Sequence, residues 1–104
     1  MLPKSERLTK IDFVTFRPKG MFRGTYVDIA STPSDISRFA CVIAKKRIKR
    51  AVDRNRVSRK VYAILEEEKP LTPRLVVVYP KISVLTGNKN LIQEEIRAAF
   101  ATLQ

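Results

Sequence analysis

The sequence predicts an α+β fold, a two-layer α/β sandwich in which helices cover a single sheet. Some segments alternate with the period of two that is typical of strands, and others follow the 3.6-residue period of a helix. Their order along the chain is helix, two or three strands, helix, strand, helix. A chain of 104 residues can bury one core of this kind but not two. We therefore expect residues 1–104 to form a single domain.

The first helix is expected over residues 3–16, because Leu8, Ile11 and either Val14 or Thr15 share one face of a helical wheel there. This helix must end before Pro18, since the residue before a proline avoids helical geometry. The segment KGMFRG that follows, residues 19–24, contains two glycines and is expected to form a turn.

Two strands are then expected in the N-terminal half. Residues 25–31, TYVDIAS, alternate so that Val27 and Ile29 share one face. Residues 38–44, RFACVIA, are more apolar and indicate a second, more buried strand. Cys41 lies in this strand, where a small buried hydrophobic residue is expected rather than a reactive thiol.

The C-terminal half is expected to contain helix, strand and helix. Residues 50–68 have the helical period, and residues 74–80, RLVVVYP, form the continuous apolar run of a central strand. The closing helix is expected near residues 91–103, after a turn. The helix over 50–68 carries one apolar stripe, made of Val57, Val61, Ile64 and Leu65.

Two acidic groups resemble metal sites but have simpler explanations. Glu66, Glu67 and Glu68 are expected to form the solvated end of a helix. Glu94 and Glu95 are adjacent, so they project about 100° apart on a helix, and we expect both to be surface charges. The sequence predicts no metal ligands.

The composition excludes several classes of function. The chain has no His, which removes the commonest general base and the usual zinc ligand. A single cysteine excludes an internal disulfide bond. No apolar run approaches the ~18 residues of a membrane-spanning helix. The N-terminus lacks the apolar core of a signal peptide, so we expect a cytoplasmic protein with no membrane partner.

A cluster of positive charge is the strongest functional signal in the sequence. The chain has a net charge of +11, and residues 45–60 hold nine cations and one acid. Arginine suits phosphate because its planar guanidinium donates two parallel hydrogen bonds. Asn55 can both donate and accept hydrogen bonds, which suits a base edge, a ribose hydroxyl or a metal-bound water. Arg54 lies near the apolar stripe on the wheel, so we expect it in a groove at the sheet edge. The cluster predicts a polyanionic partner, either a nucleic acid or another anionic surface.

The segment AKKRIKRAVDRNRVSRK, residues 44–60, resembles the signature of the bacterial ribonuclease P protein family. RLTKIDF, RFACVIAKK, RLVVVYPK and NLIQEEIRAAFATL resemble the family's first helix, two of its strands and its final helix, in the right order. The resemblance implies a left-handed βαβ crossover in a mixed sheet of αβββαβα order, as in domain 2 of ribosomal protein S5.

The resemblance also implies a function. The family's protein binds a catalytic RNA, one protein per RNA, and helps to remove the 5′ leader of precursor tRNA. Mg²⁺, held mainly by the RNA, supplies the hydrolytic chemistry, so no catalytic residue is expected in the protein. The residues expected to contact the catalytic RNA are the cluster's polar members: Lys45, Lys46, Arg47, Lys49, Arg50, Arg54, Asn55, Arg56, Arg59 and Lys60.

The family holds the single-stranded leader in a cleft between the sheet and the first helix. The corresponding residues here are Phe13, Phe16, Arg17, Val27, Ile29 and Tyr79. The family spaces two Phe residues four apart in this helix, whereas Phe13 and Phe16 are three apart, so either Phe16 or Arg17 takes the second position. Tyr79 replaces a small residue and could narrow the cleft or stack on a base.

Two other classes of function stay open at this point. A general structured-RNA-binding or ribosome-associated protein would carry the same basic cluster without a processing role. A self-sufficient nuclease would need a His or a carboxylate cluster, and neither is evident in the sequence.

Overall fold

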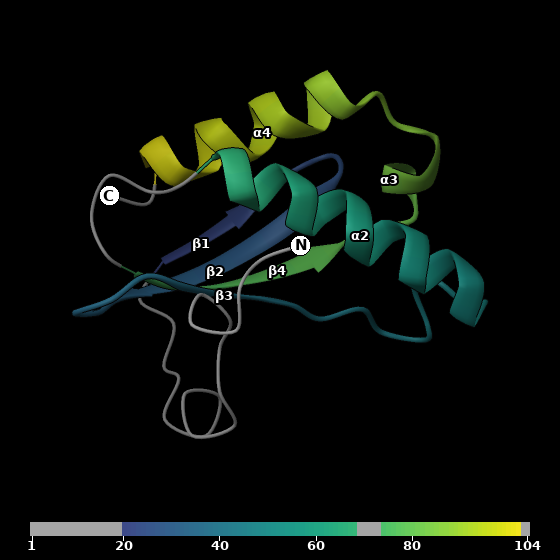
Figure 1. The fold of residues 1–104 in the computed structure, drawn as a ribbon, viewed down its shortest axis with the longest axis horizontal. Helices are drawn as coiled ribbons and strands as arrows, with labels where there is room; N and C mark the ends of the chain where they lie inside the picture. The colour runs from purple at the N-terminus through teal and green to yellow at the C-terminus, as the bar shows by residue number, and fades with distance from the viewer. Residues whose placement is uncertain (1–19, 69–73, 103–104) are drawn as a thin grey trace.

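The computed structural model describes residues 20–68 and 74–102 (Figure 1). The helix expected over residues 3–16 lies outside the described residues. The described helices and strands are β1 (Gly20–Arg23), β2 (Val27–Pro33), β3 (Arg38–Cys41), α2 (Ala51–Glu67), β4 (Arg74–Pro80), α3 (Ser83–Thr86) and α4 (Lys89–Thr102).

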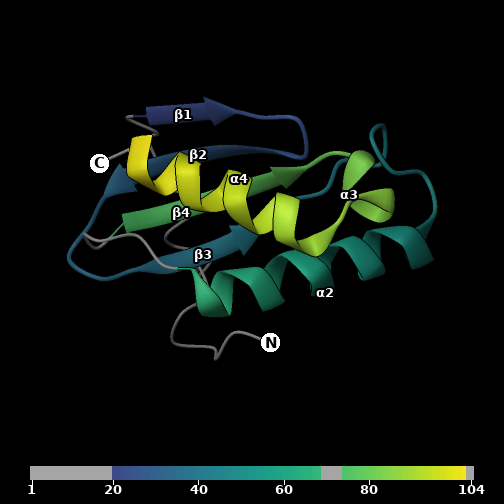
Figure 2. The same cartoon turned by 90° about the horizontal axis from the view of Figure 1, so that it is seen from above.

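The four strands form one mixed sheet in the order β1-β2-β4-β3. β2 pairs antiparallel with both β1 and β4, whereas β3 pairs parallel with β4. α2 connects the parallel strands. With the helices toward the viewer, β3 runs to the right, α2 returns to the left in front of the sheet, and β4 lies above β3 (Figure 2). This crossover is left-handed, against the usual preference, and the mixed sheet with its helices confirms the predicted fold class.

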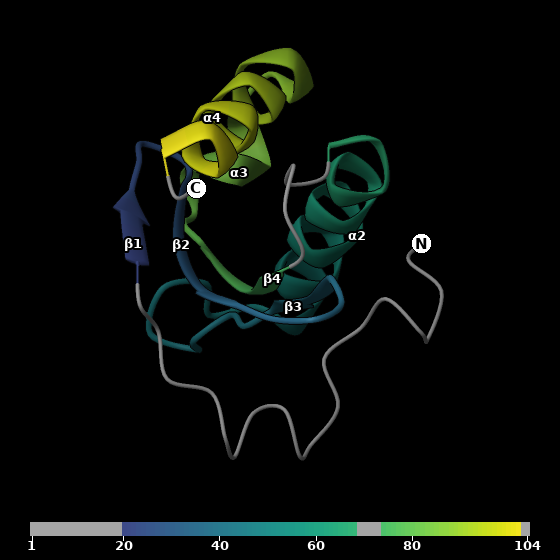
Figure 3. The ribbon, with the colours of Figure 1, turned by 90° about the vertical axis from the view of Figure 1, so that its left-hand side faces the viewer.

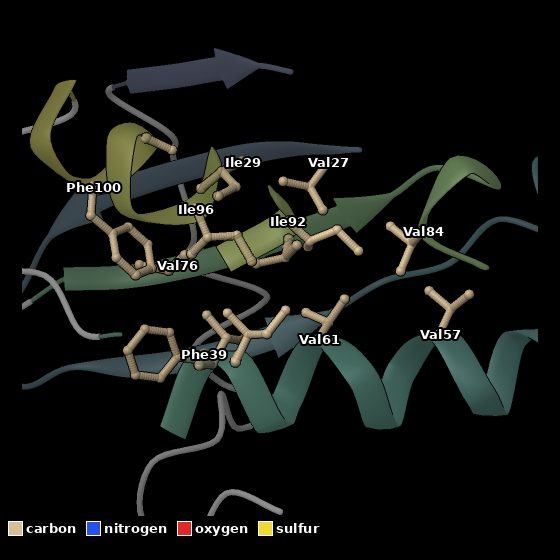
Figure 4. Packing of buried hydrophobic residues seen from close by; sticks show 14 of the residues in the cluster. Val27, Ile29, Phe39, Val57, Val61, Val76, Val84, Ile92, Ile96 and Phe100 are labelled. Carbon is tan, nitrogen blue, oxygen red and sulfur yellow. The ribbon is translucent and has the colours of Figure 1, made fainter. Parts of the chain in front are cut away.

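Helices α2 and α4 lie on the same side of the curved sheet (Figure 3). The core fills the space between them and the sheet (Figure 4). The predicted stripe of α2 is buried as expected, and Phe39 of β3 meets Phe100 of α4 at a ring-centroid distance of 6.3 Å. Burying each such side chain is worth about 1.5–3 kcal/mol. The stripe therefore fixes which half of α2 faces outward.

Two short elements differ from the sequence prediction. The expected turn over residues 19–24 contains strand β1, which pairs with β2 from Gly20 opposite Ser31 to Arg23 opposite Asp28. α3 is a single helical turn that was not predicted, and it buries Val84. Both elements have only four residues, so a periodic pattern cannot develop in them.

Candidate nucleic-acid interface

Five of the predicted RNA-binding cations lie in a turn before α2 and not in the helix. We call residues 45–50 the basic turn. Ala44 accepts backbone hydrogen bonds from Arg47 and Ile48 at 3.0 and 3.2 Å. Ile48 is 1% exposed and anchors the turn in the core. The cations around it are all exposed: Lys45, Lys46, Arg47, Lys49 and Arg50.

The outward half of α2 continues this cationic surface. Asn55, Arg56 and Arg59 are exposed, on the side of the helix away from its buried stripe. Within residues 20–68 and 74–102, the side chains of Arg56 and Arg59 make no hydrogen bond or ion pair, nor do those of Lys45, Lys46 and Lys49. These five cations are available to an anionic partner.

Arg54 and Lys60 have intramolecular roles that the sequence pattern did not indicate. Arg54 Nη1 donates to the carbonyl oxygens of Ile48 and Lys49, at 3.0 and 2.8 Å. It thereby fastens the basic turn to the first turn of α2. Lys60 Nζ donates to the carbonyl oxygens of Val84 and Gly87, both at 3.0 Å, and so ties α2 to the end of α3.

Val27 and Ile29 were predicted to line the leader cleft, and the structure contradicts this prediction. Both are fully buried on the helix-covered face of the sheet, packed in the core, so they cannot line an open cleft. The prediction is wrong for these two residues because alternation sorts β2 into two faces without saying which one the helices cover. Their neighbour Asp28 points to the opposite face, where it pairs in register with Tyr79 of β4.

An open cleft of about 450 Å³ lies on that opposite face. We call it the second-face cleft. Its described lining residues are Met21, Arg23, Asp28, Arg47, Tyr79 and Lys81. Tyr79 was predicted in the leader cleft, whereas Arg23 and Lys81 were missed. The register that places Arg23 and Tyr79 beside Asp28 could not be read from the sequence. The predicted residues Phe13, Phe16 and Arg17 lie outside the described residues.

The charges in the second-face cleft are arranged around Asp28. Arg47 donates from Nη2 to Asp28 Oδ2 at 3.1 Å and from Nη1 to the carbonyl of Tyr79 at 3.2 Å. Lys81 Nζ lies 3.4 Å from Asp28 Oδ1. Burial raises the pKa of Asp28, but the hydrogen bonds and charges of Arg47 and Lys81 outweigh it and lower the pKa. Arg47 thus connects this cleft to the basic turn.

The turn between β1 and β2 is held by Glu95 of α4, which was expected to be a surface charge. Its carboxylate accepts hydrogen bonds from the backbone N–H groups of Thr25, Tyr26 and Val27, at 2.6, 2.8 and 3.0 Å. Lys81 Nζ also donates to the carbonyl of Gly24 at 2.6 Å. These contacts fix the β1–β2 turn. The expectation for Glu95 was wrong because its partners lie about 70 residues away in the sequence.

Of the three glutamates expected at the solvated end of a helix, Glu66 and Glu67 are exposed, whereas Glu68 is half-buried and forms an ion pair with Arg97. Among the described residues, no three His, Cys, Asp or Glu side chains gather as a metal site. Burial raises the pKa of Cys41 to about 12, although a hydrogen bond with Ser58 lowers it, so the thiol stays protonated near neutral pH. None of the described helices is long and apolar enough to cross a membrane.

The sequence and the fold were compared with known proteins. Residues 2–104 match the Ribonuclease P family. A Staphylococcus aureus RNase P protein mutant with defective mRNA degradation activity has a similar fold, with a TM-score of 0.78 and 18% identity over 95% of this chain and 88% of that chain. The RNase P protein from Thermotoga maritima has a TM-score of 0.77 and 19% identity over 95% and 98% of the two chains. No curated protein sequence matches.

Proposed function

Because the chain belongs to the ribonuclease P family, we propose that it binds the catalytic RNA of that ribonucleoprotein and the 5′ leader of precursor tRNA. It thereby assists endonucleolytic removal of the leader. We assign one protein to each RNA, and the cytoplasm as the place where the complex works.

The observation that carries this proposal is the free cationic surface of the basic turn and α2. Lys45, Lys46 and Lys49 are exposed on the basic turn, and Arg56 and Arg59 follow on the outward half of the helix. Each phosphate that such a side chain neutralises releases condensed counterions, which favours binding and makes it weaken with salt. A rigid array of cations, on a turn and a helix that are both anchored in the core, suits a folded RNA backbone.

The second-face cleft is the site that we propose for the leader. Tyr79 offers an aromatic face for a base, and stacking of this kind is worth about 1–3 kcal/mol per base and tolerates any base. Arg23, Arg47 and Lys81 supply positive charge around it. A subunit that serves many tRNA precursors needs this tolerance. Phe13 and either Phe16 or Arg17, which lie outside the described residues, remain proposed leader-binding residues.

We assign the hydrolysis to the RNA and its Mg²⁺ ions. When bound, Mg²⁺ activates a nucleophile and stabilises the charge that develops on the phosphate. The described acidic residues do not form a three-ligand site, and Asp28 and Glu95 are engaged by basic and backbone groups. We therefore assign no part of the hydrolysis to a metal ion held by the protein. The protein's part is to bind and position two RNA segments.

Reconstitution tests the proposal directly. The protein is added to the catalytic RNA of the same ribonuclease P at low Mg²⁺, and leader removal from precursor tRNA is followed. We expect stimulation of cleavage when the RNA is present and no cleavage by the protein alone. A general RNA-binding protein would bind structured RNAs without stimulating cleavage, and that result would refute the proposed function.

A further inference from the structure

The basic turn contains a pocket whose exposed surface is mostly apolar, although most of its lining residues are charged. Binding of phosphate does not explain this apolar surface. The pocket has a volume of about 310 Å³, at the lower end of the range for small-ligand sites. Its described lining residues are Lys46, Arg47, Ile48, Lys49, Arg50, Asp53 and Ile82. It therefore combines four cations and one acid with two isoleucines.

Ile82 is the unusual member of this set. It is 60% exposed, the largest value among the exposed large hydrophobic residues of the described chain. Single exposed apolar residues are common on protein surfaces, but this one stands among cations on the surface that we assign to RNA. Contact with phosphates requires no apolar side chain there.

The pocket is held in shape from both sides. Arg54 fixes the carbonyl groups of Ile48 and Lys49, so the basic turn cannot easily open. On the other wall, the Ile82 carbonyl accepts a hydrogen bond from the Leu85 backbone at 3.0 Å. The neighbouring Lys81 N–H donates to the carbonyl of Tyr26 at 2.8 Å, which joins this wall to the sheet. A pocket with fixed walls loses little entropy when it binds a ligand.

The chemistry of the walls defines the occupant. A nucleobase has a flat, apolar face, and an unpaired base in RNA can leave its stack to lie on a protein side chain. The phosphates on either side of that base remain charged and need cations. We propose that this pocket receives the base of one unpaired nucleotide of the bound RNA, with the base against Ile82 and its phosphates near Lys46 and Lys49. This inference rests on the proposed function, in that it takes RNA as the partner of the basic turn.

The base contact and the phosphate contacts respond differently to salt, so a salt titration can distinguish them. A phosphate contact adds to the slope of log K against log salt, whereas a base resting on an isoleucine does not. Ile82→Asn should therefore weaken binding of the protein to the catalytic RNA about tenfold, because the apolar contact of one side chain with the base is lost, and it should leave the salt slope unchanged. Ile82→Phe should retain the wild-type affinity, because it preserves an apolar face.

Leu91→Asn is the matched control. Leu91 is 51% exposed on α4 and does not line the pocket, so this variant should bind as the wild type does. Thermal melts of all three variants establish that each is folded. Wild-type affinity for Ile82→Asn, or an equal loss for Leu91→Asn, would overturn the inference while leaving the proposed function intact. Failure of the wild-type protein to bind the RNA would instead refute the proposed function.

A second measurement tests the pocket without the large RNA. The wild-type protein is titrated with adenosine 5′-monophosphate and, separately, with ribose 5-phosphate, while the methyl resonances of Ile82 and Ile48 are followed by NMR. We expect the nucleotide to shift both methyl resonances and the sugar phosphate to leave them in place. Equal shifts with the two ligands would show a phosphate site only and would contradict a base pocket.

Discussion

Arg54 Nη1 lies 2.8 Å from the carbonyl oxygen of Lys49, so an arginine at the centre of the basic cluster binds the protein's own backbone. Its neighbour two residues on, Arg56, is exposed and makes no such contact among the described residues. The two arginines have the same charge and lie on the same helix. Their surroundings nevertheless differ: Arg54 holds the basic turn, whereas the exposed Arg56 is available to a partner.

Arg54→Ala should lower the free energy of unfolding by about 1–2 kcal/mol, because it removes hydrogen bonds from a charged donor to two backbone carbonyls. Arg56→Ala should leave it within about 0.5 kcal/mol of wild type, as expected for an exposed side chain. Chemical denaturation followed by circular dichroism measures both. Arg56→Ala should instead reduce the salt slope of RNA binding by about 1. Equal stability of the two variants would contradict this division of roles.

Glu95→Ala should destabilise the protein by about 2 kcal/mol, because three backbone N–H groups of the β1–β2 turn lose a charged acceptor. Glu94→Ala is the matched control, since Glu94 is adjacent, carries the same charge and is exposed. It should change stability by less than about 0.5 kcal/mol. Denaturant midpoints compare the two variants. A similar loss of stability in both variants would show that the hydrogen bonds from the turn to Glu95 do not stabilise the protein.

The same site predicts a coupling with Gly24. A Cβ added to Gly24 would lie 2.5 Å from Cδ of Glu95 and 2.7 Å from both of its carboxylate oxygens. Gly24→Ala should therefore be destabilising in the wild type and much less so in the Glu95→Ala background, where the carboxylate is gone. A double-mutant cycle measures this coupling. Additive effects would show that the close approach of Gly24 to Glu95 has no energetic consequence.

The parts of the fold that the sequence predicts well are those with long hydrophobic patterns. The stripe from Val57 to Leu65 spans more than two helical turns, and RLVVVYP is a continuous apolar run, so each defines its element without help from the rest of the chain. β1 and α3 are too short to do so. The left-handed crossover followed from the family resemblance alone, because handedness depends on how distant segments pack.

The candidate site was predictable in composition but not in geometry. Counting charges located the cationic surface, yet it could not show that Lys60 caps α3 or that Glu95 holds a turn some 70 residues away. Alternation placed Val27 and Ile29 together correctly. It could not say that the helices cover their face, because β4 is apolar on both of its faces. These facts depend on tertiary packing.

Glu68 provides a test of stability against pH. Hydrogen bonds from Arg97 and Gln93 lower the pKa of Glu68 to about 2, from an ordinary value of 4.5. Arg97 Nε donates to Glu68 Oε2 at 3.1 Å. A carboxylate whose pKa falls on folding adds stability above its unfolded pKa, and this stability is lost as the pH falls. The pair is partly exposed, so the effect should be small.

The wild type should therefore lose stability between pH 4.5 and pH 2 more steeply than Glu68→Gln. Urea midpoints measured at several pH values across this window test the prediction. The pKa of Asp28 is also lowered, but Asp28 contributes the same pH dependence to the stability of both proteins. Its effect therefore cancels in the comparison. Parallel curves for the two proteins would show that the Glu68 carboxylate is not coupled to folding.

Arg23 tests the second-face cleft as the leader site. It is exposed at the end of β1, lines the cleft, and was not among the residues expected from the sequence. Arg23→Gln should weaken binding of the reconstituted complex to precursor tRNA and lower the salt slope by about 1, because one phosphate contact is lost. Its affinity for mature tRNA, which has no leader, should not change.

Lys89→Gln removes the same charge from α4 and should leave both affinities unchanged. If Arg23→Gln weakened precursor and mature tRNA equally, the charge would act on the tRNA body and the cleft would not hold the leader.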